Sequence, residues 1–265
     1  MNPFKPSLAR FSRSTPIASS PRTLGVATGC IAGIARNSKY DGIELKQQDP
    51  SPFIPDDFRN RASLSNHSPS HRQISDSPFT HLLYSITRSL TQTPTANLPQ
   101  LTSILRSYVS NPLHWSAYAH ANPSKQYTRN LVLEVPGIFN LLILVWTPGK
   151  RSAVHDHADS HCLMKILQGE LVERRFAIPK FPGTEGKLKQ TAKAEYGTGK
   201  VTYMSDQLGL HSIANPSQSN YAVSLHLYTP PNAAVRGCHV YDADNGSAEH
   251  VMQGAYDSVR GIVQE

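Results

Sequence analysis

A succession of short apolar runs between residues 128 and 229 restricts the fold more than any other feature of this sequence. Each run has the length of a β-strand, and turns containing Gly or Pro separate the runs without an intervening helical pattern. Many short strands with tight turns are typical of a β-sandwich or β-barrel. We expect strands over residues 128–134, 138–147, 152–157, 162–168, 171–178, 200–204, 208–215 and 221–229. The polar stretch 181–196 is expected to be a long hairpin loop.

A helical lead-in is predicted before the strands. Apolar residues over 79–90 recur at helical spacing. Asn97 and Asn111 are candidate N-caps, and each is followed within two residues by a proline, as in the first turn of a helix. Residues 241–265 have a mixed pattern, and we assign no secondary structure to them.

Residues 1–76 are rich in Ser and Pro, and we expect them to form a disordered basic extension. Their ten basic and six acidic side chains account for +4 of the net charge of +7. The charge left on residues 77–265 is ordinary for a folded domain, so we expect no nucleic-acid partner.

The first 40 residues contain six Lys or Arg and no acid, a composition that also resembles a mitochondrial presequence. Several prolines interrupt the amphipathic helix that a presequence needs. We therefore expect a cytoplasmic protein, with mitochondrial targeting as the alternative. The three cysteines, Cys30, Cys162 and Cys238, are widely spaced, which fits a reducing compartment. No apolar run reaches the roughly 20 residues that cross a bilayer, and no membrane partner is expected.

His155 and His157 are the clearest candidates for chemistry, because they follow one buried run and precede another. Side chains at positions i and i+2 of a strand share a face, so two imidazoles placed this way can chelate one metal ion. A third ligand must come from elsewhere in the chain, and His211 is the best candidate. The competing candidates are His161, His226 and His239.

The spacing around this pair resembles the first motif of the cupin superfamily. The matching positions are Gly149, His155, His157, Cys162 and Gly169. Cys162 stands where the motif usually has Glu. His211 and Asn215 are similar to the second motif, although the Pro-x-Gly that usually precedes its His is only partly present. A Cys in the Glu position is the departure that marks the cysteine dioxygenases.

Further segments resemble signatures of the cysteine dioxygenases, namely residues 127–132, 155–162, 209–211 and 224–231. The resemblance covers about residues 80–243. It implies that residues 77–265 form a mainly β catalytic domain, a cupin-type β-barrel (jelly roll) with a short N-terminal helical lead-in.

The same resemblance implies a reaction and a metal. His155, His157 and His211 would hold Fe(II), Arg129 would bind the carboxylate of L-cysteine, and Tyr127 would lie beside Arg129. The sulfur would take both atoms of O2, giving cysteine sulfinic acid (3-sulfinoalanine), the first step of cysteine catabolism toward taurine and sulfate. A monomer is expected.

The resemblance also implies a thioether cross-link between Cys162 and Tyr228, with His226 holding the phenol and Ser224 on the same strand face. The segment ends in Thr229-Pro230, and such a bond can be cis. Without the resemblance, Cys162 reads as a buried small hydrophobe and Tyr228 as a core residue.

Three other functions stay open at this point. The chain could be a dioxygenase for another small thiol such as 3-mercaptopropionate, although Cys162 and Arg129 favour cysteine. It could be a non-catalytic cupin that binds a ligand, or a cupin isomerase that uses zinc or manganese, since Zn²⁺ also accepts three imidazoles. Asp156 and Asp159 are expected to be turn residues or neighbours of the ligands.

Overall fold

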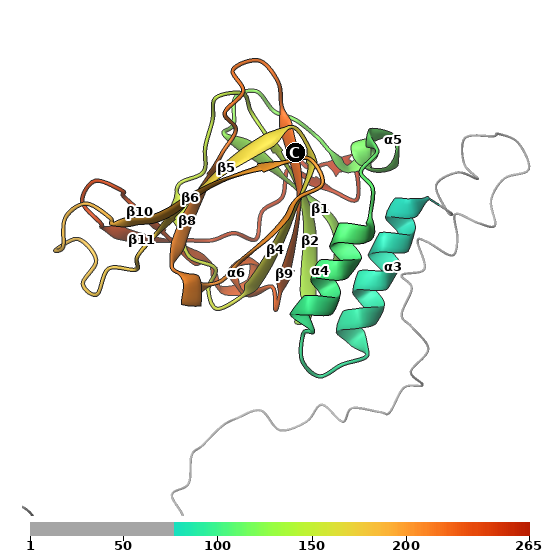
Figure 1. The fold of residues 1–265 in the computed structure, drawn as a ribbon, viewed down its shortest axis with the longest axis horizontal. Helices are drawn as coiled ribbons and strands as arrows, with labels where there is room; N and C mark the ends of the chain where they lie inside the picture. Colours follow the sequence, from blue (N-terminus) through green and yellow to red (C-terminus); the bar gives the residue numbers. More distant parts are fainter. Residues whose placement is uncertain (1–76) are drawn as a thin grey trace, which may run out of the picture. The chain divides into compact units, whose positions relative to one another are not determined.

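The structure is a computed structural model, and it describes residues 77–265. The predicted basic extension, residues 1–76, lies outside the described residues. Two β-sheets pack face to face, and helices cover the outer face of one of them (Figure 1).

The larger sheet has seven strands in the order β13-β12-β1-β2-β9-β4-β7. In chain order they are β1 (Tyr127–Val135), β2 (Phe139–Trp146), β4 (His161–Gln168), β7 (Val201–Met204), β9 (Ala222–Thr229), β12 (Ser258–Val259) and β13 (Ile262–Val263). The smaller sheet has six strands in the order β11-β10-β3-β8-β5-β6. They are β3 (Val154–His155), β5 (Glu170–Phe176), β6 (Gln190–Gly197), β8 (Leu210–Ala214), β10 (Cys238–Tyr241) and β11 (Ala248–Val251).

Strand β2 explains how two apolar layers arise from one sheet. All eight of its residues are buried. Because successive side chains of a strand point to opposite faces, Leu142 and Leu144 pack between the two sheets, whereas Leu141 and Ile143 pack toward the helices. A strand covered on both faces therefore has a continuous apolar sequence rather than an alternating one.

The helices begin where the sequence predicts. They are α3 (Pro78–Thr91), α4 (Leu98–Ser107) and α5 (Pro112–Trp115), followed by a 3-10 turn at Ser116–Tyr118. The side chains of Ser77, Asn97 and Asn111 each accept a hydrogen bond from a backbone N–H of the first turn. None of the described helices is long and apolar enough to span a membrane.

The expected hairpin loop over residues 181–196 is wrong in its second half, because β6 spans Gln190–Gly197 and pairs with β5. This strand forms the edge of the smaller sheet, and most of its residues are exposed, so it has no apolar pattern to reveal it. The strand expected over 152–157 is reduced to Val154–His155.

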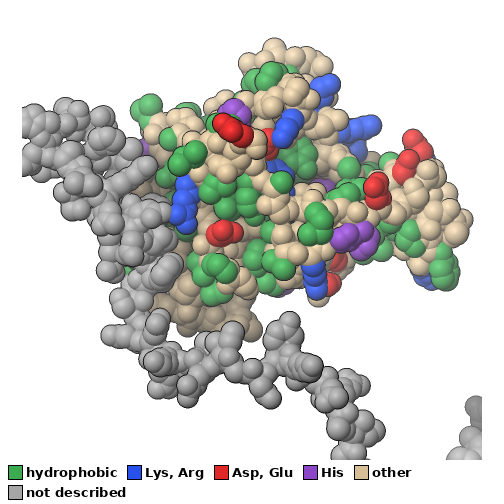
Figure 2. All heavy atoms as spheres, turned by 180° about the vertical axis from the view of Figure 1, so that it is seen from behind, with side chains coloured by type: hydrophobic (Ala, Val, Ile, Leu, Met, Phe, Trp, Pro, Cys, Tyr) green, Lys and Arg blue, Asp and Glu red, His purple; other side chains and the backbone are tan. Residues whose placement is uncertain are grey.

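The segment without a predicted structure, 241–265, supplies strands β11, β12 and β13. Two of these join the larger sheet beside β1. Two short one-turn elements complete the fold, the 3-10 helix Asp206–Leu208 and the helix α6 (Asn232–Arg236). The Thr229–Pro230 peptide bond is cis. Lys, Arg, Asp and Glu side chains are interspersed on the face shown in Figure 2.

Candidate metal centre and its pocket

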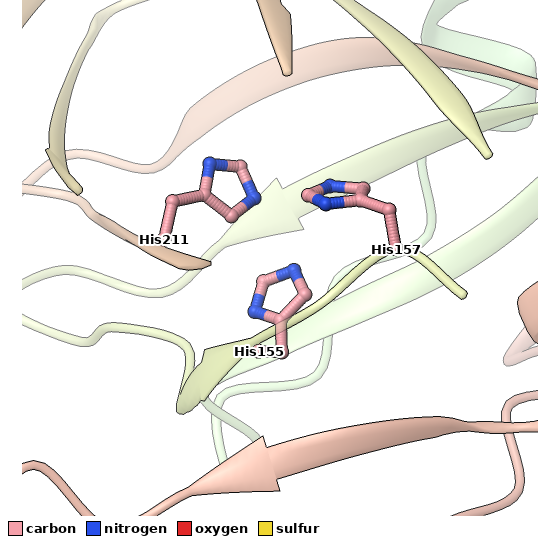
Figure 3. A group of neighbouring side chains, drawn as sticks. All are labelled: His155, His157 and His211. Carbon is pink, nitrogen blue, oxygen red and sulfur yellow. The ribbon is translucent and has the colours of Figure 1, made fainter. Parts of the chain in front are cut away.

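Three histidines from the smaller sheet converge on one point. His155 ends β3, His157 follows two residues later, and His211 lies on β8, directly opposite His155 in the antiparallel pair. The ring centroids are 5.4 Å apart for His155 and His157, and 4.7 Å apart for each of these with His211. Their candidate ligand nitrogens all lie within 4.8 Å of one another, and the rings point toward a common centre (Figure 3).

Hydrogen bonds fix which nitrogen of two rings has a lone pair. The Nδ1 of His155 donates to the carbonyl oxygen of Ala153 over 3.0 Å, and the Nδ1 of His211 donates to a carboxylate oxygen of Glu173 over 2.8 Å. The Nε2 of each ring is then unprotonated. Such donation to an oxygen is the usual way in which a metal-binding histidine is oriented.

His157 fits a metal ion for a different reason. Both of its ring nitrogens are buried, and neither has a hydrogen-bond partner among the described residues. A buried polar atom without a partner costs about 1–3 kcal/mol. A cation at the centre of the three rings would use one of these lone pairs, so the cluster is suited to a metal ion.

Burial also keeps the three rings neutral. It lowers the pKa of His155, and it lowers the pKa of His157 and His211 well below the ordinary value, with the neighbouring histidines adding to the shift in these two. A neutral imidazole has a free lone pair, whereas an imidazolium has none. The rings are therefore ready to act as ligands at neutral pH.

Asp206 holds the turn that presents His157. One of its carboxylate oxygens accepts the backbone N–H of His157 over 2.6 Å, and the other accepts that of Asp159 over 2.7 Å. Ala158 and Asp159 have φ of 50° and 62°, which are uncommon for residues with a side chain. The side-chain amide of Asn232 donates to the carbonyl oxygen of Ala158 over 2.9 Å. These contacts stabilise an unfavourable backbone turn.

Glu173 orients the ring of His211, because it accepts the hydrogen bond from Nδ1. It lies on β5 and is 1% exposed. Its second carboxylate oxygen accepts from Nε of Arg175 over 3.0 Å and from the hydroxyl of Tyr196 over 3.1 Å. Neither Glu173 nor Asp206 is predicted as a site residue from the sequence. Glu173 could have been found, because it shares a strand face with the apolar Leu171, whereas no pattern marks Asp206.

The larger sheet supplies the opposite wall. Arg129 and Tyr127 lie on the same face of β1, and the Tyr127 ring is 4.7 Å from that of Trp146. The Nη1 of Arg129 donates to the backbone carbonyl oxygens of Gln253 and Ala255. Among the described residues, no hydrogen-bond partner is found for its Nε and Nη2. The guanidinium therefore keeps free donors beside the pocket.

Cys162 and Tyr228 are directly opposite each other in the antiparallel pair of β4 and β9. Residues at such positions have Cβ atoms about 4.5–5.5 Å apart on one face of the sheet. Burial raises the pKa of the Cys162 thiol to about 12 and raises that of the Tyr228 phenol well above its ordinary value. Both groups are therefore protonated in the folded chain.

A chain of hydrogen bonds leads to the Tyr228 hydroxyl. The indole N–H of Trp146 donates to Ser224 over 2.8 Å, and the Ser224 hydroxyl is 2.8 Å from Nε2 of His226. The Nδ1 of His226 is 3.2 Å from the Tyr228 oxygen. Burial lowers the pKa of His226 to about 3, so this ring is neutral.

One cavity of about 70 Å³ connects the histidines with the opposite wall. Since a water molecule needs roughly 10–15 Å³ of such volume, the cavity suits a small ligand. The site residues expected from the sequence that line it are Tyr127, Arg129, His155, His157, His211, His226 and Tyr228, and Asp156 and Cys238 line it as well. Cys162 and Ser224 lie behind them, in contact with His226.

The competing histidines His161 and His239, and Asp159, do not line this cavity. His161 contacts the hydroxyl of Tyr203 over 2.9 Å. His239 pairs with Asp156 over 2.9 Å, and Asp159 pairs with Arg236 over 2.9 Å. Asp156 also accepts the backbone N–H of Ala158 and so belongs to the turn after the histidine pair.

Two facing β-sheets that bring three histidines together at one end of an enclosed pocket define a protein of the cupin type. The family model described as cysteine dioxygenase type I matches residues 69–244. The chain therefore belongs to the cysteine dioxygenase type I family.

Relatives of known name agree with this assignment. The chain is 40% identical over 156 residues to cysteine dioxygenase type 1 of Bos taurus, covering 59% of this chain and 75% of the relative. It is 39% identical over 155 residues to that of Homo sapiens, covering 58% and 74%.

Similar solved structures are more distant. A Klebsiella pneumoniae protein with a double-stranded β-helix domain is 16% identical, with a TM-score of 0.34, and covers 44% of this chain and 88% of its own. The Cnp3 cupin domain of Schizosaccharomyces pombe is 13% identical, with a TM-score of 0.33, covering 42% and 69%.

Proposed function

We propose that this protein oxidises L-cysteine with O2 to cysteine sulfinic acid, using Fe(II) held by His155, His157 and His211. The observation that supports this most is the convergence of three neutral imidazoles on one small cavity that also contains a guanidinium with free donors. Three neutral ligands leave a ferrous ion with its full charge and with open positions. When bound, the iron supplies the redox chemistry that O2 requires to react with a thiol.

Arg129 is proposed to bind the substrate carboxylate. Its Nε and Nη2 form one edge of the guanidinium fork, and a carboxylate matches that edge with two parallel, charge-assisted hydrogen bonds. Tyr127 packs beside it and closes this end of the pocket. The substrate thiol and amine would then face the three histidines from the other end.

The Tyr228 hydroxyl is proposed to donate a hydrogen bond into the pocket. An indole N–H can only donate, so the Ser224 oxygen accepts from Trp146, and its own hydrogen is directed to Nε2 of His226, the only acceptor it meets within the described residues. The Nδ1 of His226 then carries the remaining hydrogen and donates to the Tyr228 oxygen. The hydroxyl hydrogen of Tyr228 is thus left for an acceptor bound in the cavity.

The proposal is tested by measuring bound metal, oxygen uptake and product in one preparation. We expect iron in purified protein, and sulfinate formed from L-cysteine with one O2 consumed for each molecule of product. If 3-mercaptopropionate is turned over faster than L-cysteine, it replaces L-cysteine as the proposed substrate. Iron-free protein that forms no sulfinate after Fe(II) is added would instead favour a ligand-binding cupin.

Cys162 and Tyr228 are proposed to form a thioether cross-link, in which the thiol S–H and one ring C–H next to the phenol oxygen are lost and the co-substrate O2 accepts the two electrons and two protons. We expect Cys162→Ser to remove a faster-migrating species on a denaturing gel and to lower turnover by about tenfold, the lower end of the effects of groups around a metal site. Cys238→Ser is the matched control for the gel pattern, since Cys238 is also buried and free. An identical band pattern in both variants and the unmodified chain would show that no cross-link forms.

A further inference from the structure

We propose that the C-terminal strap, defined as residues 252–259, is part of the substrate site and that Asp257 positions Arg129. The strap follows β11 and includes β12. It lies beyond residues 69–244, which the family model matches. The inference rests on the proposed carboxylate-binding role of Arg129.

The first support is the pairing of Asp257 with the Arg129 backbone. A carboxylate oxygen of Asp257 accepts the N–H of Arg129 over 2.8 Å, and the N–H of Asp257 donates to the carbonyl oxygen of Arg129 over 2.8 Å. The other carboxylate oxygen pairs with Lys125. The Asp257 side chain is only 13% exposed, so water competes little for these bonds. Asp257 therefore fixes the point from which the Arg129 side chain leaves β1.

The second support is the set of contacts that the strap makes with the Arg129 guanidinium. Both hydrogens of Nη1 are used by the carbonyl oxygens of Gln253 and Ala255. The Tyr256 ring lies 5.3 Å from the central carbon of the guanidinium, within reach of a cation–π contact. Three residues of the strap, 253, 255 and 256, thus contact one side of the guanidinium and direct its other side to the pocket.

The third support is the register that places the strap. Strand β12 pairs with β1 in parallel, with Ser258 opposite Asn130. The buried Ser258 hydroxyl donates to the side-chain oxygen of Asn130 over 2.7 Å. Because Asn130 directly follows Arg129 in the chain, this bond keeps the strap next to Arg129. The strap also forms part of the cavity wall, through Gln253.

The chemistry of these contacts suits a substrate site. Carbonyl oxygens and an aromatic face orient a guanidinium without cancelling its charge, whereas a carboxylate on the guanidinium would compete with the substrate. The carboxylate oxygens of Asp257 instead accept from the backbone N–H of Arg129 and from Lys125. A guanidinium that is already oriented also loses less rotamer freedom when it binds a carboxylate. The strap therefore prepares Arg129 for an anionic ligand.

The test compares two thiols on protein loaded with Fe(II) in the absence of O2. L-Cysteine has a carboxylate, and 2-aminoethanethiol lacks it but retains the thiol and amine. We expect Asp257→Ala to raise the dissociation constant of L-cysteine by roughly tenfold, as for one weakened hydrogen bond to a charged group, and to leave that of 2-aminoethanethiol and the iron content unchanged. Asp257→Asn preserves the shape and should give a smaller change in the same direction. Asp244→Ala, at an exposed aspartate, is the control.

A second arm uses the Arg129→Ala background. There, Asp257→Ala should add no further loss of L-cysteine binding, because Asp257 acts through Arg129. Equal weakening of both thiols, or an undiminished effect of Asp257→Ala without Arg129, would overturn the proposed positioning role. If the unmodified protein binds both thiols equally, the carboxylate role of Arg129 fails, which is a separate result from failure of the strap.

Discussion

Replacing His157 with Leu will abolish iron binding, and turnover will fall by roughly a thousandfold or more, because two remaining imidazoles form a far weaker site for a ferrous ion. The metal-free protein will respond in the opposite way. The His157 ring is buried, and neither of its nitrogens has a hydrogen-bond partner within residues 77–265, so an apolar side chain of similar size removes an unsatisfied group. We expect the metal-free variant to be more stable to unfolding by about 1 kcal/mol.

The two effects are separated by measuring melting temperatures with and without Fe(II). The unmodified protein should gain stability when the metal is added, since an ion that binds only the folded state shifts the unfolding equilibrium. The His157→Leu variant should show no such gain. His161→Leu is the control, because His161 contacts Tyr203 and lies outside the cluster. A metal-dependent gain in His157→Leu equal to that of the control would contradict its role as a ligand.

Replacing Arg129 with Ala will raise the KM for L-cysteine by at least about a hundredfold, because two hydrogen bonds to a charged group contribute about 1.5–3 kcal/mol each. Iron content should not change, since Arg129 belongs to the larger sheet, whereas His155 and His211 lie on the smaller sheet and His157 follows its strand β3. Steady-state kinetics with metal analysis on the same samples check both parts.

Two further variants distinguish charge from shape. Arg129→Lys retains the charge without the planar fork, so its KM should lie between those of the unmodified protein and Arg129→Ala. Arg106→Ala, on the exposed side of α4, should have no effect. An equal loss of iron and of cysteine binding in Arg129→Ala would contradict the assignment of a carboxylate site.

The parts of the site that the sequence predicted depend on short-range patterns. The spacing of His155 and His157 and the apolar runs around them are visible within 20 residues, His211 is a candidate as the third histidine, and the family resemblance supplies the role of Tyr228. The direct opposition of Cys162 and Tyr228 follows once β4 and β9 pair, but the sequence contains no sign of which strands become neighbours.

The strand and the residues that the sequence does not predict depend on long-range contacts or on an unusual composition. Strand β6 was mistaken for a loop because an edge strand exposed on both faces can be polar throughout. Asp257 lies 128 residues from Arg129, and its segment pairs in parallel with β1, a contact that leaves no periodic mark in the sequence. Asp206 accepts from the backbone N–H groups of residues 157 and 159. Every residue except proline has such a group, so the residue types do not reveal this contact.

The separation of the site between two sheets has a mechanical consequence. The imidazoles and Glu173 are fixed to one layer, while Arg129 and Tyr228 are fixed to the other. Side chains such as Ile166 and Ile213 occupy the space between the layers and so set their spacing. A smaller side chain at such a position would shift the anchoring wall relative to the ion without touching either, so catalytic rate should be the first property to suffer from changes deep in the apolar interior.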